Sequence, residues 1–309
     1  NGLATHESGS YSISMNECHI SSNKSYGLNI GHNVGFTIKN STFGANTSGF
    51  MRLYPNLAGG IDSTNHFTSP GKIELISGNV TRDAFWPGFF STDSAWYFIN
   101  DNTNVYGSST EPATLEIGEG AEIRFPNSAG SILQVGYSTS LGSLVVNGTA
   151  ENPVKFTSAE VSPAAGNWRY IFLTTTARKA VFKHTIMEYG GKSQGYGDDA
   201  TIKSEADTLM ISDSEIRLSG SQGIAVRAAS NLISLERVSI TGSNYNGLAT
   251  HESGSYSISM NDCHISSNQR YGLNIGHDVD FTIKNSTFGA NTSGFMRLYP
   301  HLAGGIDSS

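Results

Sequence analysis

The chain contains a long internal repeat, which constrains its fold more than any other feature. Residues 1–64 recur as residues 246–309, at an offset of 245. The two copies differ at seven positions, none of which changes a large apolar residue: Glu17/Asp262, Lys24/Gln269, Ser25/Arg270, Asn33/Asp278, Gly35/Asp280, Asn56/His301 and Thr64/Ser309. Such a period is typical of tandem arrays. We therefore interpret residues 1–64 as the C-terminal part of a preceding unit and residues 65–309 as one complete unit, so that the chain is a slice of a longer array.

A shorter period lies inside the unit. One apolar position recurs with spacings of 24, 25 and 23 residues, at Ile216, Ile240, Ile265 and Phe288. Each is followed by a glycine and an apolar residue, at Gly223-Ile224, Gly247-Leu248, Gly272-Leu273 and Gly294-Phe295. Apolar and polar residues alternate within the short runs, and Ser, Thr, Asn and Gly separate them. This pattern predicts two or three short strands per unit of about 24 residues.

A coil this short cannot bury an apolar face alone, so coils must stack on one another. The predicted fold is an all-β parallel β-solenoid, with a rise of about 4.8 Å per coil and ladders of Ile and Val inside. Asparagines at bends, such as Asn268 and Asn291, can continue their amide hydrogen bonds from coil to coil, and glycine supplies left-handed backbone angles there. Residues 177–191 could also fit a helix. We predict strands because Gly190-Gly191 ends the segment and Ile186 fits the ladder position.

Composition excludes several classes of protein. Charged residues make up only 15%, while Gly supplies 35 positions and Pro 8, which excludes a coiled coil, collagen and a charge-rich disordered chain. With 19 Lys+Arg against 26 Asp+Glu, the net charge is −7, so a nucleic-acid partner is not expected. No stretch is apolar enough to span a membrane, and the first residues do not resemble an export signal.

One segment departs from the repeating pattern because aromatic residues crowd into it. They are Phe85, Trp86, Phe89, Phe90, Trp96, Tyr97, Phe98 and Tyr106. This density indicates a cap or a junction between coils. We expect the cluster to cover an open sheet edge and to prevent nonspecific strand pairing there.

Four runs carry a resemblance to a known family. They are LEIGEGAEIRF, GSLVVNGTAENPVKFTS, GNWRYIFL and HTIMEYGG, within residues 115–191. This region resembles bacterial right-handed parallel β-helix repeat proteins of the cell surface, a pectin-lyase-like solenoid of the adhesin or fibre type. The coils through about residue 298 resemble the generic repeats of that family, and residues 65–110 match only loosely. The resemblance implies a right-handed helix and an exported, surface location, and it brings no catalytic motif.

The two cysteines, Cys18 and Cys263, occupy one repeated position. About ten coils separate them, or on the order of 50 Å, which excludes a disulfide between them. Ser214, Val238 and Ser286 take the same place in other coils. We therefore interpret the cysteines as small buried residues, neither nucleophiles nor zinc ligands.

Parallel β-helices include polysaccharide lyases and hydrolases, whose chemistry uses clustered aspartates with calcium, or Asp and His in a groove. Candidates here are Asp198-Asp199, His251-Glu252 with its copy His6-Glu7, and Gly276-His277-Asp278. The other copy of the triplet reads Gly31-His32-Asn33, whose amide cannot act as an acid or base. Solvated bends explain all of these residues more simply. We predict no catalytic, cofactor-binding or metal-binding residues.

Six Asn-x-Ser/Thr triplets occur, at Asn40, Asn46, Asn79, Asn147, Asn285 and Asn291. Because a solenoid rich in Ser and Asn produces such triplets by composition, we interpret them as parts of ladders and not as glycan acceptors.

These observations favour a structural repeat segment of a long extracellular bacterial surface fibre or adhesin, which provides reach, attachment or cell contact and is not an enzyme. Its expected partners are neighbouring units of the same chain, identical chains in a fibre, and cell-surface glycans. One alternative is a polysaccharide lyase or hydrolase using Asp198 and Asp199. Another is a carbohydrate- or cell-binding module with contacts in the loops 159–168 or 191–200.

Overall fold

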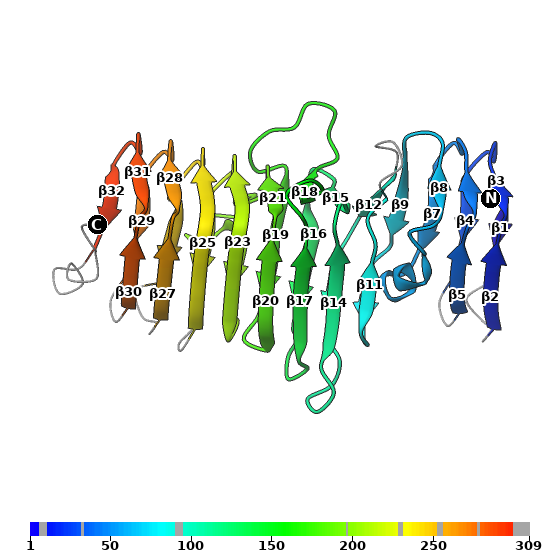
Figure 1. The fold of residues 1–309 in the computed structure, drawn as a ribbon, viewed down its shortest axis with the longest axis horizontal. Coiled ribbons are helices and arrows are strands. Elements are labelled where there is room, and N and C mark those ends of the chain that lie inside the picture. Colours follow the sequence, from blue (N-terminus) through cyan, green and yellow to red (C-terminus); the bar gives the residue numbers. More distant parts are fainter. Residues whose placement is uncertain are drawn as a thin grey trace.

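The computed structural model describes residues 1–5, 11–31, 34–89, 95–195, 197–227, 231–251, 256–276 and 279–298. These residues wind into one elongated stack of coils, whose first and last coils lie at opposite ends of the molecule (Figure 1). Every pairing between two of its named strands is parallel. The predicted all-β parallel β-solenoid is therefore confirmed.

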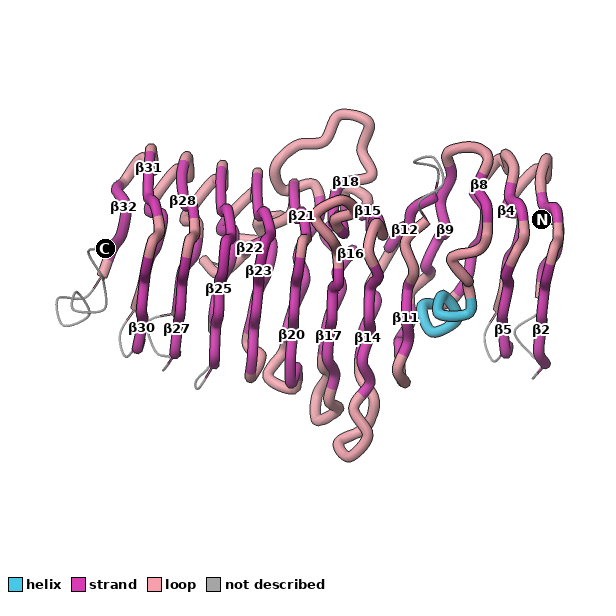
Figure 2. The backbone as a smooth tube through the Cα atoms, viewed as in Figure 1, coloured by secondary structure: helices cyan, strands magenta, loops and turns pink. Residues whose placement is uncertain are grey.

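The strands form three rows along the stack (Figure 2). Row 1 contains β11 (Ala84–Trp86), β14 (Ala113–Gly118), β17 (Gly142–Asn147), β20 (Ala177–Lys183), β27 (Tyr256–Asn261) and β30 (Val279–Lys284). Row 2 contains β1 (Leu3–Ala4), β4 (Tyr26–Asn29), β7 (Gly49–Leu53), β9 (Gly71–Leu75), β12 (Ala95–Ile99), β15 (Glu122–Phe125), β18 (Val154–Ser158), β21 (Thr185–Glu188), β28 (His264–Ser266) and β31 (Thr287–Gly289). The strands β23 (Thr208–Arg217) and β25 (Asn231–Thr241) run through both rows and join them into one 18-stranded sheet.

Row 3 is a separate nine-stranded sheet. It contains β10 (Gly78–Val80), β13 (Thr103–Val105), β16 (Ser128–Val135), β19 (Trp168–Leu173), β22 (Ala200–Ser204), β24 (Gln222–Val226), β26 (Leu248–Thr250), β29 (Tyr271–Asn274) and β32 (Gly294–Arg297). Near the N-terminus, β2 (Tyr11–Asn16) pairs with β5 (Val34–Lys39), and β3 (His19–Ile20), β6 (Thr42–Phe43) and β8 (His66–Phe67) form a small sheet. A short 3₁₀ helix, η1 (Pro55–Gly60), lies beside β11 (Figure 2).

Apolar ladders fill the interior, as the sequence predicts. The inward position of row 2 is occupied coil after coil by Leu3, Leu28, Met51, Ile73, Tyr97, Ile123, Phe156, Met187, Ile216, Ile240, Ile265 and Phe288. The members from Leu28 to Ile265 are at most 1% exposed. Each coil thus hides the apolar face of the coil before it, which provides most of the favourable free energy of folding.

The coils are not uniform in length. The predicted spacing of about 24 residues holds from Ile216 to Phe288, but Ile123 and Phe156 stack although they lie 33 residues apart in sequence. Residues 177–191 form the predicted strands β20 and β21. Two register details were wrong: Met187, and not Ile186, occupies the ladder, and Met296, and not Phe295, stacks on Leu273.

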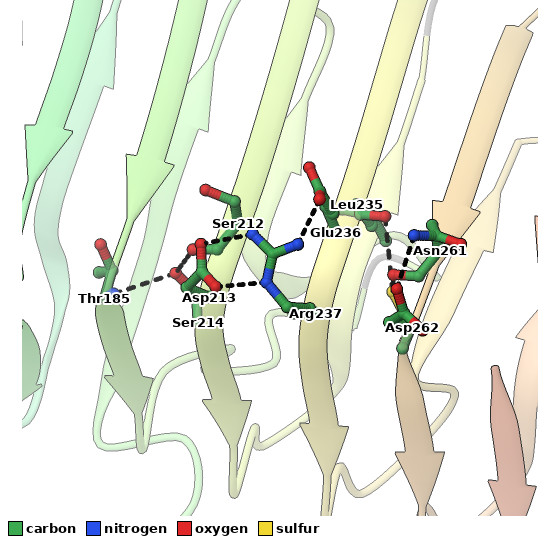
Figure 3. Close-up of polar contacts among 10 residues, drawn as sticks. Thr185, Ser212, Asp213, Ser214, Leu235, Glu236, Arg237, Asn261 and Asp262 are labelled. Carbon is green, nitrogen blue, oxygen red and sulfur yellow. Dashed lines mark hydrogen bonds and ion pairs between the residues drawn. The ribbon is translucent and has the colours of Figure 1, made fainter. Parts of the chain in front are cut away.

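Residues with positive φ form the bend between rows 1 and 2, and few of them are glycines. His184, Asp213, Arg237, Asp262 and Asn285 have φ between 44° and 53°. At the bends of Asn268 and Asn291, where glycine was predicted to supply such angles, the prediction holds only in part, because Ser267 (φ 59°) and Ala290 (φ 49°) have positive φ there as well as Gly294 (φ 130°). Hydrogen bonds between coils hold the strained backbone: the Thr185 N–H donates to Ser214 Oγ at 3.0 Å, and the Arg237 guanidinium binds both Asp213 oxygens at 2.6 and 3.0 Å (Figure 3).

Asparagine side chains form the predicted ladders. Asn268 Nδ2 donates to Asn291 Oδ1 at 2.9 Å, while Asn268 Oδ1 accepts the Ser243 N–H at 3.0 Å. The first copy repeats this arrangement between Asn23 and Asn46, at 2.8 Å. Asn40, Asn79 and Asn285 each contact an asparagine of the adjacent coil in the same way, whereas Asn147 instead donates to Glu116. These amides supply partners to backbone groups that the tight bends leave unpaired.

Three members of the aromatic cluster, Trp86, Phe89 and Tyr97, lie inside the stack, whereas Phe85 is exposed and Trp96, Phe98 and Tyr106 are partly buried. Trp86 and Tyr97 are fully buried and stack at 5.3 Å between ring centroids. The strand β12 pairs on both sides, with β9 and with β15, so no open edge exists there for the cluster to cover. The expected edge cap was wrong, and the alternative of a junction is correct. Phe90 lies outside the described residues.

At this junction the rows are rearranged, although strand pairing passes the predicted unit boundary without a break. The sequence YGLN forms β4 in row 2 in the first copy, but β29 in row 3 in the second. The sheet of β3, β6 and β8 ends, β7 pairs with β9 of row 2, and β10 begins row 3 against η1. One row therefore ends and another starts where the two units meet.

Candidate functional site

A hollow of about 560 Å³ lies on the outer side of row 3, over β24 and β26. Its lining combines small, polar and charged side chains with one aromatic ring: Gly195, Gly197, Asp198, Gln222, Ala225, Val226, Arg227, Tyr245, Asn246, Ala249, Thr250, His251 and Asn274. A volume of this size is in the range of small-molecule sites. We call this surface the row 3 groove.

The position of the groove follows from the alternation of inward and outward side chains along the strands of row 3. The register of row 3 aligns Lys203, Ala225, Ala249 and Asn274 in one outward column. The two alanines form a low floor, and the larger side chains of Lys203 and Asn274 stand at its ends. Gly195, Gly197 and Asp198, which precede β22, supply one wall.

The carboxylate of Asp198 is held by two cations in this wall. Its Oδ2 lies 2.7 Å from Lys203 Nζ and 2.7 Å from Arg227 Nη1. Burial opposes ionisation, but the hydrogen bond from Lys203 and the charges of Lys203 and Arg227 outweigh it and lower the pKa of Asp198. The group is therefore ionised and paired at neutral pH, which suits it to fixing Arg227 in place and not to donating a proton.

Asp199 plays a different part from its neighbour. Its side chain is buried, and Oδ2 accepts hydrogen bonds from the Gln194 N–H at 2.6 Å and from Ser193 Oγ at 3.3 Å. It thereby shapes the loop. The predicted pair of adjacent carboxylates is thus divided between the groove and the loop interior, and the two do not converge on one position.

Polar side chains around the groove are fixed by hydrogen bonds. Gln222 Nε2 donates to the Gly197 carbonyl at 2.8 Å, and its Oε1 accepts from Asn246 Nδ2 at 3.2 Å. The ring of Tyr245 lies against the guanidinium of Arg270, at 4.1 Å from the centroid. The arrangement can present donors, acceptors and an aromatic face to a polar ligand without reorganising.

The other sequence candidates are placed only in part. His251 lines the groove, and Gly31 and Gly276 occupy bends. Their companions His6, Glu7, His32, Asn33, Glu252, His277 and Asp278 lie outside the described residues. Within the described ranges, no three His, Cys, Asp or Glu side chains gather as metal ligands would.

Sequence reasoning missed Lys203, Gln222, Arg227 and Tyr245. One signal was available, because Ala225 and Ala249 follow the repeated Gly-Ile and Gly-Leu pairs at outward positions, where a small residue leaves a hollow.

The predicted burial of the cysteine position is confirmed for Cys263, whereas Cys18 is only partly buried. Both cysteines are free thiols. Cys263 is 2% exposed, its Sγ lies 3.4 Å from the Asn261 carbonyl, and burial raises the pKa of its thiol. Its N–H donates to Ser286 Oγ at 3.0 Å, as the Thr185 N–H does to Ser214. The site therefore selects small side chains at the bend.

A second polar surface follows the outside of row 2. Glu188 accepts from Thr157 Oγ1 at 2.8 Å and pairs with Lys155 at 2.9 Å and Arg217 at 2.8 Å, and it is only 4% exposed. Further along, the Arg124 guanidinium lies 3.9 Å from the centroid of the Trp96 ring. These contacts join successive coils from outside.

The coils, the rows and the interior ladders together define a right-handed parallel β-helix. Residues 144–301, about half of the chain, match the family model described as right handed beta helix region. The chain belongs to this family. No curated protein and no solved structure matches it. None of the helical segments in the described ranges is long and apolar enough to cross a membrane.

Proposed function

We propose that this chain is a structural segment of a long extracellular surface fibre or adhesin, in which end-to-end β-helix units provide reach. The observation that carries the proposal is strand pairing across the unit boundary: β6 pairs with β8, and β7 pairs with β9. Repeated units joined in this way, whose 64 shared residues differ at only seven positions, extend a rod, whereas an enzyme gains little from repeating one site every 245 residues.

The mechanical role follows from the coil geometry. Nine coil steps lead from Leu28 to Ile265 along row 2. At about 4.8 Å per step, one unit adds roughly 43 Å to the rod. The backbone hydrogen bonds run along the axis, so every coil shares a pulling force with its neighbours.

A surface location in a bacterium is part of this proposal, and the resemblance of residues 115–191 to surface repeat proteins supports it. The proposal includes no catalytic role. Its partners are adjoining units, identical chains in a fibre and cell-surface glycans. The state of Asp198 supports the absence of catalysis, because this carboxylate is already paired with two cations.

Electron microscopy of the native protein on its cells tests the proposal. Rods with an axial period near 43 Å are the expected result. Compact particles without a shaft would contradict it.

A second function, carbohydrate contact, is favoured by the row 3 groove. The ring of Tyr245, the guanidinium of Arg227 and the amide of Asn274 surround an alanine floor, which suits a polar, ring-shaped ligand. On a glycan array, Ala225→Trp should abolish binding by filling the groove, while Tyr137→Ala, which removes an exposed ring elsewhere, should leave binding unchanged. Release of shortened products would instead indicate a lyase or hydrolase.

A further inference from the structure

We propose that the outer face of the coil at residues 271–298 is a docking surface for a second copy of residues 65–99. The proposal rests on the proposed function, since it names the partner with which a unit of the rod joins. Nearly the same sequence occurs twice in the chain. Residues 26–53 are covered by the segment that begins at residue 65, whereas residues 271–298 have no such segment beside them, so the exposure of the two copies can be compared directly.

The apolar residues of the two copies differ sharply in exposure. Phe50 is 1% exposed, whereas its counterpart Phe295 is 59% exposed. Met51 and Leu53 are fully buried, but the corresponding Met296 and Leu298 are only partly buried. Since the sequence from residue 271 to residue 298 matches that of residues 26–53 closely, the difference reflects what covers each copy.

Phe67 and Gly71 of the following segment cover Phe50. The Phe50 ring lies 4.7 Å from the centroid of Phe67 and 6.0 Å from that of Phe43, and Phe67 in turn contacts Phe89 at 4.8 Å. Gly71 lies directly over the ring, because a Cβ atom at this position would come within 2.7 Å of Phe50. The partner therefore needs a glycine at this position and a phenylalanine four residues earlier.

A polar cluster adds selectivity to the same junction. The Tyr26 hydroxyl donates to Glu74, Lys72 Nζ lies 2.5 Å from the Glu74 carboxylate, and Arg52 Nε lies 3.5 Å from it. Lys72 also lies over the Phe98 ring, at 4.5 Å from the centroid. Tyr26 and Arg52 belong to the covered copy, while Lys72, Glu74 and Phe98 belong to the covering segment.

The second copy retains the receiving half of this cluster. Tyr271 and Arg297 are the counterparts of Tyr26 and Arg52. Within the described residues, no ion pair of Arg297 is found. The surface thus presents the guanidinium of Arg297 and the phenol of Tyr271 to a carboxylate equivalent to Glu74, and the exposed ring of Phe295 to a glycine equivalent to Gly71.

An ordinary coil of the unit does not fit this surface equally well. Within the described residues, no strand of row 3 contains an acidic residue, so none of them offers the carboxylate that Glu74 places beside Tyr26 and Arg52. The strand β7, by contrast, pairs with β9, which begins at Gly71 and contains Glu74. The change of rows at the junction is therefore a means of recognition between units.

The experiment compares the 309-residue chain with an extended chain in which a second copy of residues 65–309 follows residue 309. Phe50→Ala and Phe295→Ala are a matched pair of substitutions in nearly identical surroundings. In the 309-residue chain, Phe50→Ala should lower the melting temperature by several degrees, and Phe295→Ala should leave it unchanged. In the extended chain, both substitutions should lower it to a similar degree.

Hydrogen exchange of the unsubstituted chains provides a readout that no folding defect can obscure. This measurement uses a chain extended by residues 65–245 only, in which residues 246–309 occur once. Peptides that contain Gln269, Arg270 or His301 then differ in mass from those of the first copy, which contain Lys24, Ser25 or Asn56. Backbone amides at residues 271–274 and 294–297 should exchange more slowly in the extended chain, by on the order of tenfold or more. Equal exchange in both chains would overturn the proposal.

Two glycine substitutions in the appended copy test the specificity. Gly71→Val should remove the added protection, because the side chain would meet the Phe295 ring, while Gly197→Ala, in open space, should keep it. Self-association of the 309-residue chain that protected Phe295 equally well would overturn the specific pairing. If the amides of residues 271–274 and 294–297 are protected in the extended chain but no rods are found on cells, the docking surface is supported and the proposed function is contradicted.

Discussion

Three outward-facing carboxylates, Glu74, Glu188 and Asp198, are held ionised by basic neighbours. Burial favours the neutral form of each, but hydrogen bonds to the ionised form outweigh it and lower all three pKa values. The donors are Lys72 and Tyr26 for Glu74, Lys155, Thr157 and Arg217 for Glu188, and Lys203 for Asp198. A lowered pKa in the folded state means that the unfolded chain binds protons first as the pH falls.

The stability of the rod should therefore fall in acid. The contribution of these groups is present above the ordinary pKa values of 4.5 for Glu and 3.8 for Asp, and it is lost as the pH falls through the lower folded values. Urea denaturation between pH 7 and pH 3 measures the effect. In Glu188→Gln the decline should be shallower than in the wild type, and an identical slope would contradict the assignment of Glu188.

The two thiols should differ in reactivity although their sequence positions are equivalent. Cys263 is buried by the coils on both sides, while Cys18 is only partly buried. Under native conditions an alkylating reagent should therefore modify Cys18 first. Mass spectrometry distinguishes the two, because Glu17 precedes one and Asp262 the other. Equal rates would show that neighbouring coils do not protect this position.

At the scale of elements, the bends are stabilised by side chains that replace missing backbone partners. The Asn268 side chain is fully buried, accepts from the Ser243 N–H at 3.0 Å and donates to Asn291 and to the Ile240 carbonyl. Its amide thus connects three consecutive coils.

Asn268→Ala should destabilise the chain by about 1–3 kcal/mol, because a buried N–H and a buried carbonyl lose their partner. The exposed Asn244 lies in the coil before it, and Asn244→Ala serves as the control, with an expected change within about 0.5 kcal/mol. Equal free energies of unfolding for the two variants would contradict the ladder.

The repeating elements could be predicted from sequence, and the irregular ones could not. Ile216, Ile240, Ile265 and Phe288 recur at nearly constant spacing, so their ladder and the ladder of Asn268 on Asn291 were evident. The choice between Ile186 and Met187 was not, because both are apolar and a one-residue shift turns the strand over.

The junction and the groove depend on information that short periods do not contain. The change of rows coincides with the packing of η1 and of the aromatic residues between coils, and these aromatic residues lie in the part of the unit that occurs once in the chain. The groove requires Lys203, Arg227 and Asp198 to meet from separate segments, which the register of row 3 determines.

At the scale of the whole molecule, we propose that successive units continue a single rod. The coils of residues 1–64 and those that follow share row 2, and Trp86, Phe89 and Tyr97 fill the interior where the rows are rearranged. A rod of this kind lengthens by a fixed amount for each unit added, roughly 43 Å.

The most direct test is small-angle X-ray scattering from the 309-residue chain and from the extended chain with one further copy of residues 65–309. For a continuous rod, the maximum dimension should increase by about 43 Å while the cross-sectional radius stays constant. A smaller increase with a thicker cross-section, or a broad distribution of distances typical of beads on a flexible linker, would contradict it.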